Sequence, residues 1–227
     1  MKKYIGIIGL LALILIASLL VGCVEGPPTD AYTSTNTQTQ TNGQTQTQTQ
    51  TNDGVNLSQL LSSSANYTSV YYEMVTTVPG QAEVVMKCWM KGQKYRMDIE
   101  SMEGLGTMTT WVFMDEQVTY TYMPIMGMVY RMQYDYSAVP DAPTTMMDYH
   151  PTVIGQEVFD GKNCVVIQYT QSNSTVKAWI WVDTGFPVKM ESTSGGVTTT
   201  IIWRNFSFNS VSDDVFDLPA GVPVIDM

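Results

Sequence analysis

The stretch TVKAWIWVDTGFPVKMESTSGGVTTTII, residues 175–202, carries the clearest structural pattern of this chain. Apolar and polar residues alternate within it in three runs, at 176–182, 188–190 and 197–201. Two turn sequences, DTGFP and GG, separate these runs. Because successive side chains of a strand point to opposite faces of a sheet, the pattern predicts an antiparallel meander with one buried face.

Strand-like runs continue on both sides of this stretch. They recur about every ten residues, at 70–77, 83–91, 93–101, 106–114, 117–123, 128–134, 152–159, 163–171 and 203–210. Asn56 can cap a short helix over residues 57–65, and the proline-bracketed segment 137–151 is a loop or a short helix that closes the mouth of the sheet. The sequence therefore predicts a mainly β fold with a few short helices: a strongly curved antiparallel sheet, or incomplete barrel, with helices covering its open, apolar side.

The predicted buried face is rich in methionine, of which the chain has 16. Alternation places the following candidates for a hydrophobic ligand site on it: Met86, Met90, Met97, Met128, Tyr130 and Met132. Unbranched, polarizable side chains suit a surface that repacks around variable apolar ligands. The alternative is that methionine fills an ordinary core, and composition alone does not decide between the two.

The start of the chain has the features of a lipoprotein signal peptide. Lys2 and Lys3 precede an apolar run at 4–21, which ends in Leu20-Val21-Gly22-Cys23. This order predicts a signal peptide over residues 1–22 and a lipidated Cys23. The alternative is an uncleaved membrane anchor, since the run nearly reaches the roughly 20 residues of a spanning helix. Both place the protein on the outer face of the cytoplasmic membrane or at the cell surface.

Residues 23–54 form the second predicted region, a disordered tether after the lipidated cysteine. It consists largely of Thr, Gln and Asn and has no apolar periodicity, so it cannot bury enough surface to offset its ordering entropy. The globular domain is expected over residues 55–227. Asn56, Asn66, Asn173 and Asn205 lie in sequons, which are acceptor sites for N-glycans on an exported chain.

Charge and composition exclude several classes of function. The net charge is −10, so the chain lacks the clustered Lys and Arg that nucleic-acid binding needs. His150 is the only histidine, which leaves no His-based triad and no multi-His metal site. We therefore expect no catalytic residues, no metal site and no cofactor.

Cys88 and Cys164 remain as a pair in a domain predicted to be exported, where disulfides persist. Cys88 alternates in phase with Met86 and Met90, and Cys164 with Val166, so both are expected on the apolar side and are candidates for a disulfide. The alternative is two buried free thiols acting as small hydrophobes.

Three segments carry a resemblance to a known family. They are VFDGKNCVVIQYT (158–170), AWIWVDTGFPVKMES (178–192) and NFSFNSVSDDVFDLPAGV (205–222). Their order resembles the C-terminal half of the LolA/LolB-like lipoprotein carrier superfamily, especially its outer-membrane lipoprotein-sorting and lipid-carrier lipoprotein branches. The resemblance implies a curved, incomplete barrel with helices in its open side and acyl chains in the cavity between them. The family's cargo-responsive arginine has no evident equivalent, because Arg96 and Arg131 fall on polar faces.

Two functions of different class follow. The first is a membrane-anchored lipoprotein whose half-barrel binds or carries a lipid or another hydrophobic ligand. The second is a structural or interaction lipoprotein of the cell envelope, with a filled core and another envelope protein as its partner.

Overall fold

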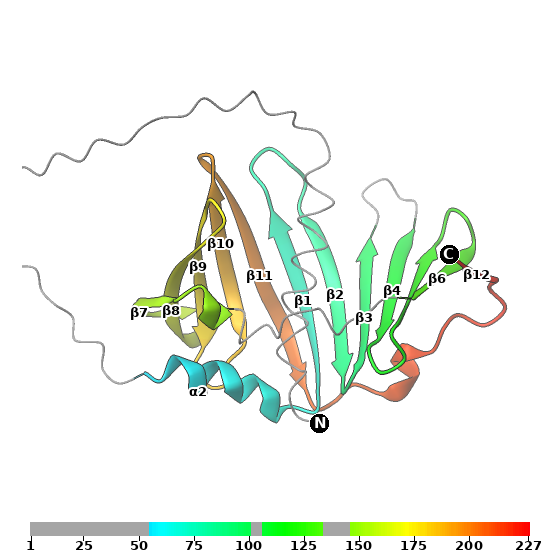
Figure 1. Cartoon of the computed structure of the whole chain (residues 1–227), viewed down its shortest axis with the longest axis horizontal. Helices are drawn as coiled ribbons and strands as arrows, with labels where there is room; N and C mark the ends of the chain where they lie inside the picture. Colours follow the sequence, from blue (N-terminus) through cyan, green and yellow to red (C-terminus); the bar gives the residue numbers. More distant parts are fainter. Residues whose placement is uncertain (1–54, 101–105, 134–145) are drawn as a thin grey trace, which may run out of the picture.

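The computed structural model describes residues 55–100, 106–133 and 146–227, which form one open, curved β-sheet with short helical segments (Figure 1). The helical elements are α2 (Leu57–Ser62) and the 3-10 helices η1 (Ser63–Asn66) and η3 (Asp213–Phe216). The strands are β1 (Ser69–Thr77), β2 (Val84–Lys91), β3 (Lys94–Glu100), β4 (Thr107–Phe113), β5 (Val118–Met123), β6 (Met128–Gln133), β7 (Thr152–Phe159), β8 (Lys162–Gln171), β9 (Ser174–Trp181), β10 (Pro187–Ser194), β11 (Val197–Phe208) and β12 (Val224–Asp226).

The twelve strands lie in the order β12-β6-β5-β4-β3-β2-β1-β11-β10-β9-β8-β7. Two meanders, β1 to β6 and β7 to β11, join through the antiparallel pair of β1 and β11. All pairs are antiparallel except that of β12 with β6, which is parallel. The predicted mainly β, incomplete barrel is therefore confirmed as an open sheet, whose edges are β12 and β7.

The meander predicted from residues 175–202 forms as β9, β10 and the start of β11. Gly195 and Gly196 both have positive φ, at 57° and 81°, which a two-residue hairpin turn requires and glycine adopts without strain. The expected strand at 203–210 is the continuation of β11 rather than a separate element. Asn205 lies where the register of β11 against β1 shifts, and it has a φ of 56°, a conformation that asparagine tolerates better than most residues.

Helix α2 packs on one face of the sheet, which we call the inner face. The Asn56 side chain caps the helix by accepting a hydrogen bond from the Gln59 amide at 3.0 Å. Leu57 and Leu61 are buried in the main hydrophobic cluster, near the turn between β9 and β10. The wider expectation, that helices cover the whole open side, stays a prediction. No helix in the described part of the chain is long and apolar enough to cross a membrane.

The opposite, outer face also carries buried residues, so the predicted single buried face is wrong for part of the sheet. In β8 the four consecutive residues Cys164 to Ile167 are all buried. Their outer-facing members pack with Trp179 and Val188 in a second hydrophobic cluster. The Lys189 ammonium lies 4.3 Å from the centre of the Trp179 ring, so long lysine stems cover this apolar surface. A strand covered on both faces loses the alternation that reveals its orientation.

Candidate functional site

The structure places all six predicted ligand-site residues on the inner face, but in two groups. Met86, Met90 and Met97 lie on β2 and β3 and are buried in the main hydrophobic cluster. The other group, Met128, Tyr130 and Met132, lies on β6 and is only partly buried, with Met132 39% exposed. Strands β4 and β5 separate the groups. The sequence thus identified the face correctly but did not distinguish filled core from accessible surface.

The buried group surrounds a small polar cluster. The Tyr72 and Tyr95 hydroxyls lie 3.2 Å apart beside Cys88, and none of the three side chains is accessible to solvent. Burial raises the pKa of the Cys88 thiol to about 12 and outweighs its hydrogen bonds to the two tyrosines, which lower that pKa. These groups stay protonated at neutral pH and satisfy one another, so they stabilise the core rather than meet a ligand.

The inner face of β4 to β6 differs from the filled part because it is partly exposed and carries no charge. The inner-facing side chains of these strands are Met108, Thr110, Val112, Thr119, Thr121, Met123, Met128, Tyr130 and Met132. One row of register partners crosses this region as Thr110, Thr121 and Tyr130. The first two hydroxyls lie 3.4 Å apart. We call Met128, Tyr130 and Met132 the β6 strip.

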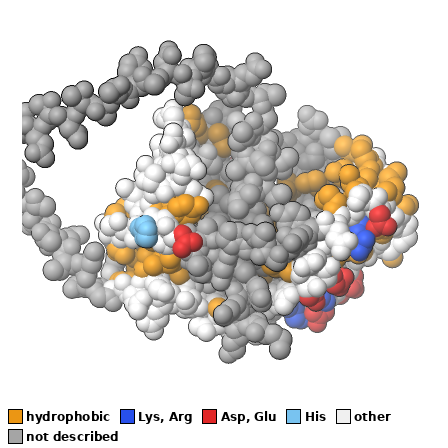
Figure 2. Space-filling model, viewed as in Figure 1, with side chains coloured by type: hydrophobic (Ala, Val, Ile, Leu, Met, Phe, Trp, Pro, Cys, Tyr) orange, Lys and Arg blue, Asp and Glu red, His pale blue; other side chains and the backbone are white. Residues whose placement is uncertain are grey.

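The turn between β5 and β6 extends the β6 strip beyond the sheet. Residues 123–128, MPIMGM, form this turn, in which Ile125 is 70% and Met126 54% exposed. Figure 2 shows hydrophobic side chains gathered at this end of the molecule, over β6 and β12. Sequence reasoning missed the feature, although its signal was present, since exposed turns are normally built from Gly, Pro, Asn, Asp and Ser.

Part of the outer face behind the β6 strip is covered. Val118 and Val129 face outward and are fully buried, and so is Trp111 on β4. The rest of this face is less covered, since Gln133 is exposed and Tyr120, Tyr122 and Arg131 are half-buried.

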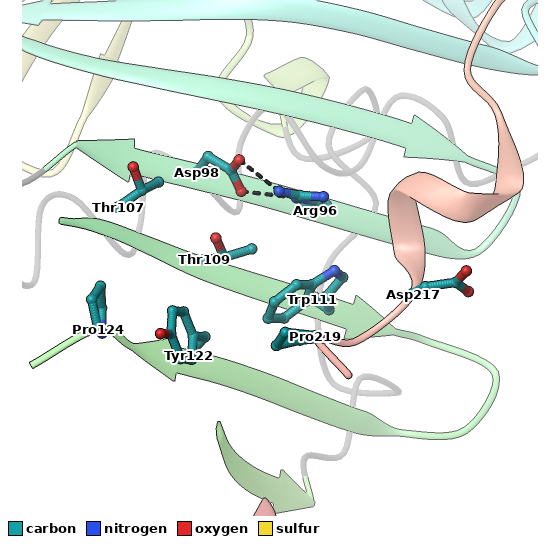
Figure 3. A pocket seen from close by; sticks show the side chains of 9 residues that line it. All are labelled: Arg96, Asp98, Thr107, Thr109, Trp111, Tyr122, Pro124, Asp217 and Pro219. Atoms are coloured by element: carbon teal, nitrogen blue, oxygen red, sulfur yellow. Dashed lines mark hydrogen bonds and ion pairs between the residues drawn. The ribbon is translucent and has the colours of Figure 1, made fainter. Parts of the chain in front are cut away.

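A pocket of about 530 Å³ lies on the outer face, between β3 to β5 and the segment after η3 (Figure 3). Its floor follows the register row Asp98, Thr109 and Tyr122 across three strands. Asp217 and Pro219 form its wall. Two of its charged lining residues, Arg96 and Asp98, bond to each other.

Arg96 fastens the C-terminal segment to the sheet. Its Nε and one Nη donate to the two Asp98 carboxylate oxygens at 2.9 and 2.8 Å, and the other Nη donates to the Val215 carbonyl at 3.0 Å. The guanidinium also lies between two indole rings, 5.1 Å from the centre of Trp89 and 5.5 Å from that of Trp111. Because these partners surround the Arg96 guanidinium, we interpret the pocket as part of the structural contact between the C-terminal segment and the sheet.

The expected disulfide is wrong in this structure, in which Cys88 and Cys164 are buried free thiols. Cys88 belongs to the inner-face cluster, whereas Cys164 belongs to the outer-face cluster. The sheet itself separates the two sulfur atoms. The prediction placed Cys164 on the inner face because it alternates in phase with the apolar Val166. Val166 is itself an outer-face residue, since β8 is apolar on both sides.

No protein-family model and no curated protein matches the chain. Among solved structures, the fold is similar to that of an uncharacterized conserved protein from Thermus thermophilus, with a TM-score of 0.58 and 10% sequence identity. The match covers 74% of this chain and 98% of that one. At this identity the likeness is one of fold.

Two further similar structures are LprF from Mycobacterium bovis and a LolA superfamily protein from Nitrosomonas europaea. Both are 14% identical to this chain, with TM-scores of 0.42 and 0.36. Each match covers 73% of this chain, and 97% and 99% of the respective relatives. At these identities and TM-scores the two matches are likenesses of this chain and carry no conclusion about its function.

Proposed function

We propose that this protein is a membrane-anchored extracytoplasmic lipoprotein whose half-barrel binds a lipid or another hydrophobic ligand on the inner face of β4 to β6. One observation carries the proposal: the inner face of these strands is uncharged and partly exposed, with Met123 37% and Met132 39% exposed. Apolar side chains that stay in contact with water do not stabilise a folded domain. An exposed apolar surface of this kind therefore favours binding of an apolar ligand.

The side chains on the inner face of β4 to β6 support a binding role rather than a catalytic one. Methionine side chains adapt to ligands of variable shape, and the interspersed hydroxyls can hydrogen-bond a polar group without adding charge. No group of His, Cys, Asp or Glu in the described ranges is arranged to hold a metal ion. The partner we propose is a lipid, presented by the membrane that holds the Cys23 anchor.

Native mass spectrometry of the gently purified protein tests the proposal. We expect a bound lipid in the wild type and a clear loss of lipid in Met128→Trp/Met132→Trp, because the two indole rings would fill the space over the β6 strip. Since these positions are partly exposed, the double variant should lose less than about 1 kcal/mol of unfolding free energy.

Met86→Trp/Met90→Trp is the matched control in the filled part of the same face. Insertion of two rings into packed core should cost about 1–3 kcal/mol per site in urea unfolding. A lipid-free wild type, or a strip variant that loses stability and keeps its lipid, would contradict the proposal and favour an envelope protein with a filled core.

The proposed anchor predicts a separate result for Cys23→Ser. The variant should leave the membrane fraction or accumulate as a precursor that retains residues 1–22, because acylation and cleavage both require the thiol. Fractionation combined with intact-mass measurement checks this. An unchanged mass and an unchanged membrane fraction would show that Cys23 is not lipidated.

A further inference from the structure

The turn between β5 and β6 presents an apolar tip with a defined shape. Residues 123–128 contain no charged side chain. The Gly127 amide donates to the Met123 carbonyl at 3.0 Å, with a φ of 60° that suits glycine. The Tyr130 hydroxyl donates to the Met126 sulfur at 2.8 Å, which ties the tip to the β6 strip. Local contacts thus fix the shape of the turn, while Ile125 and Met126 stay exposed.

The apolar surface of the tip is continuous with the inner face. Behind the tip lie the β6 strip and then Ile225, the register partner of Tyr130 on β12. The charged neighbours Arg131 and Asp226 occupy the alternate positions and pair at 3.0 Å on the outer side. An uncharged surface therefore runs from Ile125, which is 70% exposed, onto the inner face of β4 to β6.

We propose that the tip, residues 123–128, inserts into the interfacial region of a lipid bilayer, and that the β6 strip leads an acyl chain from the bilayer to the inner face. The proposal rests on the proposed lipid-binding function and names the route by which the ligand reaches its site. An exposed apolar patch of this kind marks a protein or membrane contact.

The length of the tether favours the bilayer as the partner. Residues 24–54 can span roughly 100 Å when extended. A compact domain of this size has a radius of gyration of about 16 Å. Helix α2, which follows the tether, lies at the end of the sheet away from β6 and β12 (Figure 1). The tether is long enough for the far end of the domain to reach the membrane that holds Cys23.

The residues around the tip also suit a bilayer. Tyr120 and Tyr122 flank it on the outer side and Tyr130 on the inner side, and tyrosine is favoured at membrane-water interfaces. The tip itself has no cation to bind anionic headgroups. Its contact should therefore depend on apolar insertion and persist on vesicles of uncharged phosphatidylcholine.

A fluorescent label at the tip tests the contact in the full, lipid-anchored protein on phosphatidylcholine vesicles. Ile125→Cys carries an environment-sensitive dye, and Val158→Cys on the edge strand β7 is the control, since both native side chains are 70% exposed. Cys88 and Cys164 are buried and should not compete for the label. We expect blue-shifted emission and quenching by acyl-chain nitroxide lipids at position 125 alone.

A second variant tests the route. Ile125→Asp/Met126→Asp should slow lipid transfer from vesicles to the protein by at least about tenfold, with unchanged lipid occupancy at equilibrium. Val158→Asp should leave both quantities unchanged. Equal quenching at positions 125 and 158, or an unchanged transfer rate, would overturn the inference even if the protein carries lipid. Quenching at 125 that appears only when another envelope protein is added would overturn it too.

The same experiment separates this inference from the proposed function. Quenching at position 125 in a protein that never binds lipid would support the membrane contact and refute the carrier role. Bound lipid without quenching at position 125 would support the carrier role and refute the membrane contact.

Discussion

Replacing Gly185 by alanine is expected to lower the free energy of unfolding by about 2–5 kcal/mol. Gly185 lies in the turn between β9 and β10 with a φ of 72°, where a side chain is strained. A Cβ there would overlap the Leu60 carbonyl oxygen and the Ser63 side chain, which belong to the helical segment packed on the turn. Since the obstacle is largely backbone, the helix would have to move away from the sheet.

Gly161→Ala is the matched control for this prediction. Gly161 has nearly the same φ, 71°, and a Cβ added to it meets no atom within 4 Å. Gly161→Ala should lower the free energy of unfolding only by the strain of an alanine at positive φ, about 1–2 kcal/mol. Urea unfolding of both variants gives the difference, which isolates the contact between turn and helix. Equal losses would mean that α2 does not pack on this turn.

Replacing Arg96 by alanine is expected to cost about 2–4 kcal/mol of unfolding free energy. The change leaves the Asp98 carboxylate, whose side chain is only 13% exposed, without its bidentate partner. It also removes the bond to Val215 and the cation between Trp89 and Trp111. Arg96→Lys should recover only part of the loss, because an ammonium cannot form the paired bonds.

Arg131→Ala provides the comparison for an exposed ion pair. Its partner Asp226 has a side chain that is 78% exposed, so the loss should be much smaller than that of Arg96→Ala. Hydrogen exchange should show faster exchange near η3 in Arg96→Ala and not in Arg131→Ala. If both variants lose the same stability, Arg96 does not fasten the C-terminal segment.

Local patterns predicted most strand positions well. The turn at Gly195 and Gly196, the start of α2 at Asn56 and the strands β1 to β10 lie close to their expected residues, because alternation, capping and turn chemistry act over a few neighbours. The three-residue strand β12 was missed. It forms only by pairing with β6, nearly a hundred residues earlier in the chain, and has no pattern of its own.

Alternation of apolar and polar residues was enough to place Met86, Met97 and Met132 on one face. The packing of distant segments makes Met97 part of a filled core and leaves Met132 in contact with solvent, and it places Cys164 on the opposite face from Cys88. Alternation fixes which neighbours share a side of a strand, but not what covers that side. The cover comes from distant segments: the hydrogen bond from Arg96 to Val215, 119 residues away, holds the C-terminal segment against the outer face.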